Sequence, residues 1–186
     1  MRWQLSWRAD PVGRDLADRH YTRQKIGAPQ FVPPGRCLVL TSEKRGKGRN
    51  RRALWVTSWP FGRFVKHAWA GAWMCSCFRN EGAGLSSALI REAVAATRWR
   101  WPDVPELGMV TFVDESQVKP RATPGLCFIE AGFQVENERS KGGLLALRLR
   151  PEDMPDAVEP MPAGLRVRVR APRPAALFPC ADRRAA

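Results

Sequence analysis

The sequence has few of the residues that common metal and redox sites require. Its 186 residues include two His, one Tyr and five Cys, and the Cys, at positions 37, 75, 77, 127 and 180, form no C-x-x-C pair. This spacing predicts no metal centre and is typical of a reduced, cytoplasmic protein. No stretch of 18 apolar residues occurs, and the first residues lack the apolar segment of a signal peptide. We therefore expect no membrane span and no secretion.

Acidic residues are also scarce relative to basic ones. The chain has 31 Lys and Arg against 18 Asp and Glu, which gives a net charge of +13. Hydrophobic residues make up 44% of the chain, enough for an ordinary core. The positive charge favours a nucleic-acid partner. However, 25 of the 31 basic residues are Arg, a bias typical of GC-rich genomes, so a purely compositional origin of the charge stays open.

The spacing of apolar residues predicts alternating strands and helices over the first 150 residues. Strands are expected over 36–41, 53–59, 66–78, 107–113 and 144–149, with a further short strand within 2–10. Helices are expected over 10–19, 84–98 and 124–132. This order predicts a mixed α/β or α+β domain over 1–150. The proline-rich residues 151–186 are expected to form a largely flexible tail, in which 165–170 could pair as an edge strand.

The loop between the expected strands at 36–41 and 53–59 is strongly basic. Six of its nine residues carry positive charge: Lys44, Arg45, Lys47, Arg49, Arg51 and Arg52. Such a hairpin is predicted to contact the phosphate backbone of DNA, although an acidic peptide could use it as well. On the expected strand at 66–78, Cys75 and Cys77 are two residues apart, so on a regular strand both would point to the same face.

A glycine-containing turn separates that strand from the longest predicted helix. The turn reads Arg79-Asn80-Glu81-Gly82-Ala83-Gly84, and the helix begins immediately after it. The first turn of a helix has backbone N–H groups without an internal partner, and glycine lets a ligand approach the backbone. The arrangement therefore predicts a phosphate-binding turn, to which the Ser86 hydroxyl could contribute. An ordinary connecting turn is the open alternative.

The pattern Arg79-x-x-Gly82-x-Gly84 resembles the pyrophosphate loop of the GNAT acyltransferase superfamily. The strand at 108–114 and the segment at 124–133, which ends in Gly-Phe, are similar to the parts that follow in that fold. The resemblance implies a mixed, mostly antiparallel sheet with splayed central strands and flanking helices. It also implies that acetyl-coenzyme A or another acyl donor binds at this turn, on Phe78, Arg79, Gly82, Ala83, Gly84 and Ser86.

Within that superfamily, dispersed residues are similar to the phage Mom family. They are His20-Tyr21, Phe78-Arg79, residues 110–114 (Val-Thr-Phe-Val-Asp) and residues 125–133 (Gly-Leu-Cys-Phe-Ile-Glu-Ala-Gly-Phe). Mom proteins modify adenine in phage DNA and so protect it from host restriction nucleases. The resemblance implies a DNA partner, a host-cytoplasmic location if the protein is phage-encoded, and catalytic roles for His20, Tyr21 and Asp114 around one cleft. A target base would have to be flipped out of the duplex to reach such a cleft.

The sequence departs from the Mom pattern at three places. Residues 111–113 are Thr-Phe-Val where the family more often has Ser-Tyr-Ala, and Pro124-Gly125 replaces an approach that contains His. Phe128 stands where the family has Tyr, so no role that needs a phenol there can be carried over. Tyr21 is the only Tyr in the chain, so the Tyr that GNAT enzymes commonly use as a general acid after their last motif is absent.

Purely structural roles stay open for the candidate catalytic residues. His20 could neutralise a helix C-terminus, Tyr21 could be a half-buried packing residue, and Asp114 could cap a loop. Two other functions also stay open. One is N-acetyl transfer to the amine of a small molecule or protein, and the other is DNA binding by a GNAT-shaped protein without catalysis.

Overall fold

A seven-stranded sheet organises the chain, whose structure is a computed structural model describing residues 2–44, 51–60, 65, 67–118 and 122–164. The strands are β1 (Gln4–Ser6), β2 (Arg36–Lys44), β3 (Arg51–Trp59), β4 (Trp73–Glu81), β5 (Met109–Val113), β6 (Gln134–Arg139) and β7 (Leu145–Leu149). Their order in the sheet is β1-β2-β3-β4-β5-β7-β6. The helices are α1 (Pro11–Asp18), α2 (Ser86–Arg100) and α3 (Leu126–Ile129), with short 3-10 turns at Glu115–Gln117 and Pro151–Asp153.

The neighbouring strands are antiparallel, with β4 and β5 as the single parallel pair among them. That pair is short. It consists of Trp73 opposite Met109, Met74 opposite Val110 and Cys75 opposite Thr111. Beyond these three pairs β4 runs on to Glu81 and β5 to Val113 without further pairing between them. The sheet is therefore split between its two central strands.

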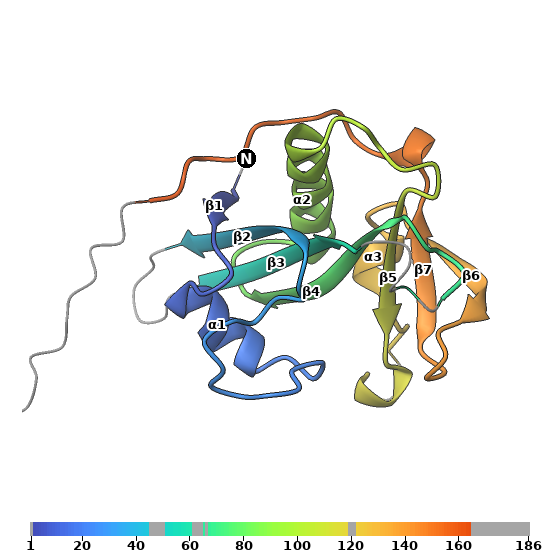
Figure 1. Cartoon of the computed structure of the whole chain (residues 1–186), viewed down its shortest axis with the longest axis horizontal. Coiled ribbons are helices and arrows are strands. Elements are labelled where there is room, and N and C mark those ends of the chain that lie inside the picture. The colour runs from blue at the N-terminus through green and yellow to red at the C-terminus, as the bar shows by residue number, and fades with distance from the viewer. Residues whose placement is uncertain (1, 45–50, 61–64, 66, 119–121, 165–186) are drawn as a thin grey trace, which may run out of the picture.

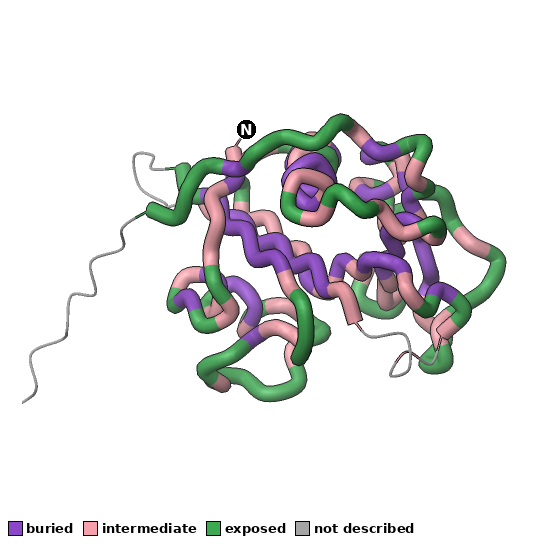
Figure 2. The backbone as a smooth tube through the Cα atoms, turned by 45° about the horizontal axis from the view of Figure 1, so that its top comes forward, coloured by how far each residue is buried: buried purple, intermediate pink, exposed green. Residues whose placement is uncertain are grey.

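Helices cover both faces of the sheet (Figure 1). The long helix α2 lies on one face, and α1 lies on the opposite face beneath β2 to β4. The strands accordingly alternate between two hydrophobic clusters. On β3, Trp55 belongs to the cluster with α2, whereas Leu54 and Val56 belong to the cluster with α1. Because both faces are covered, the central strands are buried along much of their length (Figure 2).

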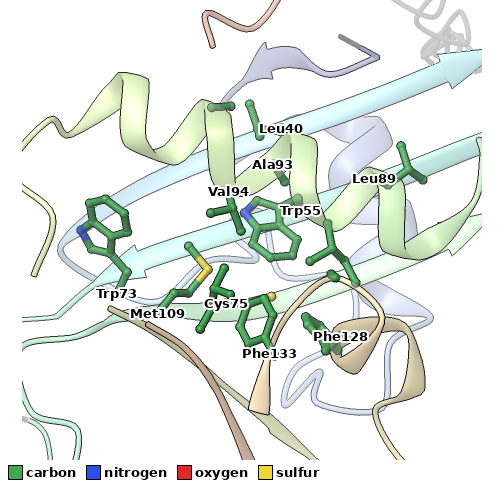
Figure 3. Packing of buried hydrophobic residues seen from close by; sticks show 14 of the residues in the cluster. Leu40, Trp55, Trp73, Cys75, Leu89, Ala93, Val94, Met109, Phe128 and Phe133 are labelled. Atoms are coloured by element: carbon green, nitrogen blue, oxygen red, sulfur yellow. The ribbon is translucent and has the colours of Figure 1, made fainter. Parts of the chain in front are cut away.

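Trp55 occupies the middle of the larger cluster. Its indole lies among residues of β4, α2 and the segment after α3 (Figure 3). Its ring N–H donates a 2.6 Å hydrogen bond to the Thr57 hydroxyl, which is 2.9 Å from the Thr97 hydroxyl on α2. Thr97 in turn donates to the Ala93 carbonyl at 2.8 Å. The polar groups of Trp55, Thr57 and Thr97 are thus satisfied in a chain of hydrogen bonds that also fixes the position of α2 on the sheet.

A β-bulge interrupts β4 where it pairs with β3. Val56 lies opposite Cys77 and Thr57 lies opposite Cys75, which leaves Ser76 as the extra residue. The bulge reverses the alternation of side chains, because Cys75 packs in the cluster with α2 and Cys77 in the cluster with α1. The expectation that both thiols share a face is therefore wrong. Alternation holds on a regular ladder, and the extra residue breaks it.

The predicted fold class, an α+β domain with a mixed and mostly antiparallel sheet, is confirmed. The third expected strand begins later and ends later than 66–78. Gly71, at a φ of 98°, completes a turn before the strand starts at Trp73. The edge strand β6 has no counterpart in the sequence prediction, because its polar residues lack the alternation typical of a half-buried strand.

The packed part of the chain extends past residue 150, where the flexible tail was expected to begin. Met154 is buried in the larger cluster, and the Val158 amide donates to the Ala95 carbonyl on α2 at 3.2 Å. The Met161 carbonyl accepts from the Leu5 amide of β1 at 2.8 Å, and the Met161 amide donates to the carbonyl of Trp3, just before β1, at 3.0 Å. A proline-rich segment can still pack against the domain when its few apolar side chains, here Met154, are buried in the core. Residues 165–186, including the possible strand at 165–170, lie outside the described residues.

The part of the chain that the structure describes contains no helix of the length and apolarity needed to cross a bilayer.

Replacing Met154 with Ala should lower the free energy of unfolding by about 2–5 kcal/mol, because it leaves a cavity in the core. Urea denaturation measures this change. The matched control is Glu152→Ala, two residues away and exposed, which should change stability by less than about 0.5 kcal/mol. If both variants are equally stable, the segment after residue 150 does not contribute to the core.

Candidate functional site at the split in the sheet

A small cavity of about 40 Å³ lies where β4 and β5 separate. Its lining comes from four parts of the chain: the segment after α1, the strands β4 and β5, and α3. The lining residues are His20, Tyr21, Thr22, Cys75, Ser76, Cys77, Phe78, Thr111, Phe112, Val113 and Phe128. Two of the three residues predicted to be catalytic therefore reach the split, together with one of those predicted to bind a donor.

His20 and Tyr21 enter the split from the end of α1. The helix ends at Asp18, and the His20 amide donates to the Ala17 carbonyl at 2.9 Å, which holds the next residues against the sheet. The two rings stack with their centroids 4.5 Å apart. The Nδ1 atom of His20 lies 2.8 Å from the Thr22 hydroxyl.

The environment of His20 keeps its imidazole neutral. Burial disfavours the charged ring, and the nearby Arg79 guanidinium repels a second positive charge, so the pKa of His20 falls from 6.5 to about 4. A hydrogen bond with the Phe78 backbone acts in the opposite direction but does not outweigh these effects. At pH 7 the imidazole is therefore unprotonated but a weak base, and its Nδ1 already accepts a hydrogen bond from the Thr22 amide at 3.3 Å.

Tyr21 links the end of α1 to β5. Its hydroxyl lies 3.5 Å from the Phe112 carbonyl and 3.4 Å from the Asp114 amide, both long for hydrogen bonds. Burial raises the pKa of Tyr21, so the phenol stays protonated and can donate. Phe128, which replaces the Tyr of the Mom pattern, packs edge-on against Phe78 in the wall of the same cavity.

Asp114 contacts Tyr21 through its backbone amide, whereas its carboxylate is bound elsewhere. Oδ1 of Asp114 accepts hydrogen bonds from the Ser116 amide at 3.0 Å and the Ser116 hydroxyl at 2.6 Å. The side chain thus caps the 3-10 turn that follows β5, which is the structural alternative considered for it. A direct role in chemistry would require the carboxylate to exchange this cap for a substrate.

The predicted donor turn follows β4 and leads into α2. Gly82 adopts a φ of 84°, which other residues rarely adopt, and the N-cap of α2 is Leu85, whose side chain makes no capping hydrogen bond. Asn80 organises the turn instead. Its Oδ1 accepts from the Ala83 amide at 3.0 Å, and its Nδ2 donates to the Gly84 carbonyl at 2.8 Å and the Ser86 hydroxyl at 2.9 Å.

Arg79 is already partnered within the chain. Its Nε donates to Glu81 at 2.8 Å and its Nη1 to the Arg19 carbonyl at 2.5 Å, while the Arg19 guanidinium grips both oxygens of Glu81 at 2.9 Å. These hydrogen bonds lower the pKa of Glu81 to about 2, the one from Arg19 most strongly. These contacts connect α1 to β4. Because Arg79 binds the carbonyl of Arg19, it helps to hold the neighbouring His20 in place, and a phosphate would have to compete with these contacts.

A different arginine lies over the glycine turn. A Cβ placed on Gly84 would approach the Arg2 guanidinium to 2.5 Å. The same guanidinium donates to Glu92 on α2 at 2.9 Å through Nε. Arg2 therefore adds positive charge at the start of α2, next to the backbone amides of its first turn.

The base of the predicted DNA-binding hairpin lies beside the glycine turn, since Arg52 forms a bridge with Gly82. Lys44 and Arg51 pair across the mouth of the hairpin and are exposed. Arg52 instead forms a 2.9 Å ion pair with Asp15 on α1, so its charge is partly neutralised. Arg45, Lys47 and Arg49 lie outside the described residues.

A second, larger cavity of about 450 Å³ adjoins the split on the α1 side. It lies between the loop at 22–34 and β4, and it shares Thr22, Ser76 and Cys77 with the smaller cavity. Its volume falls in the range of ~300–1,000 Å³ that small-molecule sites occupy. Polar side chains of the loop, among them Gln24, Lys25 and Gln30, line it.

Comparison of the chain with protein-family models, with curated proteins and with solved structures gives no match. Conclusions about the site therefore depend on the residues and geometry of this chain. Within the described ranges, no three or more His, Cys, Asp or Glu side chains gather as metal ligands would.

Two residues that position the site were not singled out from the sequence. Asn80 had a recognisable signal, because Asn side chains in turns often hydrogen-bond to the backbone a few residues further on. Ser76 had none, because a bulge is defined by pairing with a distant strand rather than by local sequence.

The lowered pKa of His20 predicts how the stability of the protein depends on pH. The unfolded chain binds a proton at this ring below pH 6.5, whereas the folded chain does so near pH 4. Between these values wild type should lose stability relative to His20→Asn as the pH falls. Because the chain has only two His, NMR titration of the His67→Asn variant observes His20 alone. A midpoint near 6.5 would show that the ring is not shielded.

Proposed function

We propose that the protein is a GNAT-like group transferase that modifies adenine bases in DNA in the manner of the Mom family. The observation that carries this proposal is the split between β4 and β5. A neutral imidazole and a protonated phenol line it, and a glycine turn at a helix N-terminus lies at the end of β4. Such a split lets two substrates approach a common point from opposite faces of the sheet.

The donor side of the proposed site is the turn at 79–84 with the start of α2. The first backbone amides of α2 carry partial positive charge, and beside them lies Arg2, whose charge Glu92 partly neutralises. These groups fit the pyrophosphate of a coenzyme A thioester, with Phe78 lining the way into the split. Acetyl-coenzyme A or another acyl donor would supply an activated carbonyl group at this point.

The acceptor side is the cavity between the 22–34 loop and β4. Its volume suits a flipped base, and its polar lining could hydrogen-bond to the base edge. In this proposal His20 gives up its contact with the Thr22 amide and accepts a proton from the exocyclic amine, while the amine nitrogen bonds to the carbonyl carbon of the donor and the carbon–sulfur bond of the thioester breaks. Tyr21 donates its hydroxyl proton or a hydrogen bond to the leaving group. Positioning would supply most of the rate, because an adenine amine is a weak nucleophile.

Expression of the protein in bacterial cells should yield a modified deoxyadenosine in their DNA, detected by mass spectrometry of nucleosides. The His20→Ala variant should reduce this product by about 10²–10⁴-fold, as expected for loss of a general base. His67→Ala, which removes the other His, is the matched control and should retain the product. Circular dichroism and gel-shift binding to DNA report whether each variant folds and binds.

Three outcomes would oppose the proposal in different ways. Full modification by His20→Ala would remove that residue from the mechanism. DNA binding by wild type with unmodified nucleosides would favour a non-catalytic DNA-binding role. Acetylation of protein or small-molecule amines without DNA modification would favour an ordinary N-acetyltransferase. Asp114→Asn separates the two roles of that residue, because loss of folding would mean that its cap on Ser116 is what matters.

The donor site can be tested with coenzyme A alone. A Gly84→Asp variant places a negative charge beside Arg2, where we expect a phosphate, so its affinity for coenzyme A should fall at least about 10-fold. Gly84→Ala adds the same Cβ without charge and is the control. Both should fold, because the close contact of the Cβ is with the end of the flexible Arg2 side chain, and Leu89 Cγ at 3.7 Å is at an ordinary contact distance. Equal binding by wild type and Gly84→Asp in calorimetry would exclude this turn.

A further inference from the structure

Ile26 is an apolar side chain held out into solvent beside the larger cavity. With 75% of its surface exposed, it is the most exposed large hydrophobic residue among those described. Other apolar side chains of the same loop pack inward, since Phe31 is buried and Val32 packs against the cluster with α1. The exposure of Ile26 therefore does not reflect a loop that lacks contact with the core.

The loop holds Ile26 in a defined position. The Ala28 amide donates to the Lys25 carbonyl, which closes a turn around Ile26 and Gly27, and Gly27 has a φ of 78°. This is the pattern of a turn that needs glycine at its third position. Ile26 is therefore the second residue of a tight turn, where its side chain projects away from the loop.

An ion pair between Arg23 and Asp18 holds that turn in place. The Arg23 guanidinium bonds to Asp18 at 2.6 Å and to the carbonyls of Ala28 and Gln30 at 2.9 and 3.1 Å. Asp18 also accepts from the Gly27 amide at 3.0 Å. The side chains of Arg23 and Asp18 keep 11% and 18% of their surface exposed, so their ion pair is partly shielded from water and fixes the loop to the end of α1.

The residues on either side of Ile26 face the cavity. Gln24, Lys25 and Ala28 line it, whereas Ile26 is not part of the lining. The loop thus presents polar groups toward the cavity and a rigid apolar tip at its outer rim. Lys25, exposed next to the tip, adds a charge suited to a phosphate.

We infer that Ile26 is a wedge that enters the base stack when the target base is flipped into the cavity, an inference that rests on the proposed function. Flipping leaves a gap in the duplex, and its cost is a few kcal/mol for a paired base. Proteins that unstack DNA commonly insert Ile, Leu, Met or Phe into such gaps, because an apolar side chain replaces lost stacking contacts. A wedge must be apolar, exposed and rigid, and Ile26 has all three properties.

The wedge is tested by permanganate oxidation of plasmid DNA, which reports thymines that have lost their stacking or their partner. Wild type should create protein-dependent reactive thymines in the duplex. Ile26→Ala should reduce their signal at least 10-fold while binding single-stranded DNA within about 2-fold of wild type, because single strands need no wedge. Ile26→Leu should restore most of the duplex signal. Val135→Ala, which shortens an exposed apolar residue on the edge strand β6, is the matched control and should behave as wild type.

The outcomes separate the inference from the proposed function. Reactive thymines that are equal for wild type and Ile26→Ala would overturn the wedge while leaving base flipping in place. An equal loss of single-stranded binding in Ile26→Ala would also overturn it, because the residue would then serve binding in general. The absence of reactive thymines with wild type would count against base flipping itself, and so against both proposals.

Discussion

The short pairing of β4 with β5 is the constraint on which the rest of the site depends. Two parallel strands that stayed paired along their full length would close the sheet, and no cavity would form between them. Here three residue pairs join the strands, and the bulge at Ser76 bends β4 just after the last of them. The side chains beyond that point line the split instead of meeting side chains of a paired neighbour.

The end of α1 fills one side of the opening that the bulge creates. Charge pairing keeps it there: Glu81 at the end of β4 binds Arg19, and Asp15 binds both Arg19 and Arg52. Exposed ion pairs contribute little individually, but a network that shares partners fixes geometry more strongly than isolated pairs do. Acidic residues are few in this chain, and two of them, Asp15 and Glu81, form ion pairs at the junction of α1, β3 and β4.

Local sequence patterns predicted the parts of the fold that depend on local periodicity. The apolar spacing of α2 and the continuous apolar run of β5 fixed both elements within a few residues, and the turn at Gly82 followed from its glycines. The family resemblance predicted that His20, Tyr21 and Asp114 lie around one cleft, and of these His20 and Tyr21 line the cavity beside β5. The reversed faces of Cys75 and Cys77, the cap role of Asp114 and the packing of Met154 depend on distant partners. No pattern within a few residues encodes such contacts.

A sheet with two open edges is exposed to association with other strands, and this chain protects each edge differently. At one end, β1 does not present a bare row of backbone groups, because Met161 returns from the far end of the described chain and bonds to it (Figure 1). At the other end, β6 is lined with Glu136, Glu138 and Arg139, whose charges oppose the approach of another strand. The segment after β7 thus covers part of the edge of β1. Loss of that segment would convert a closed edge into a template for aggregation.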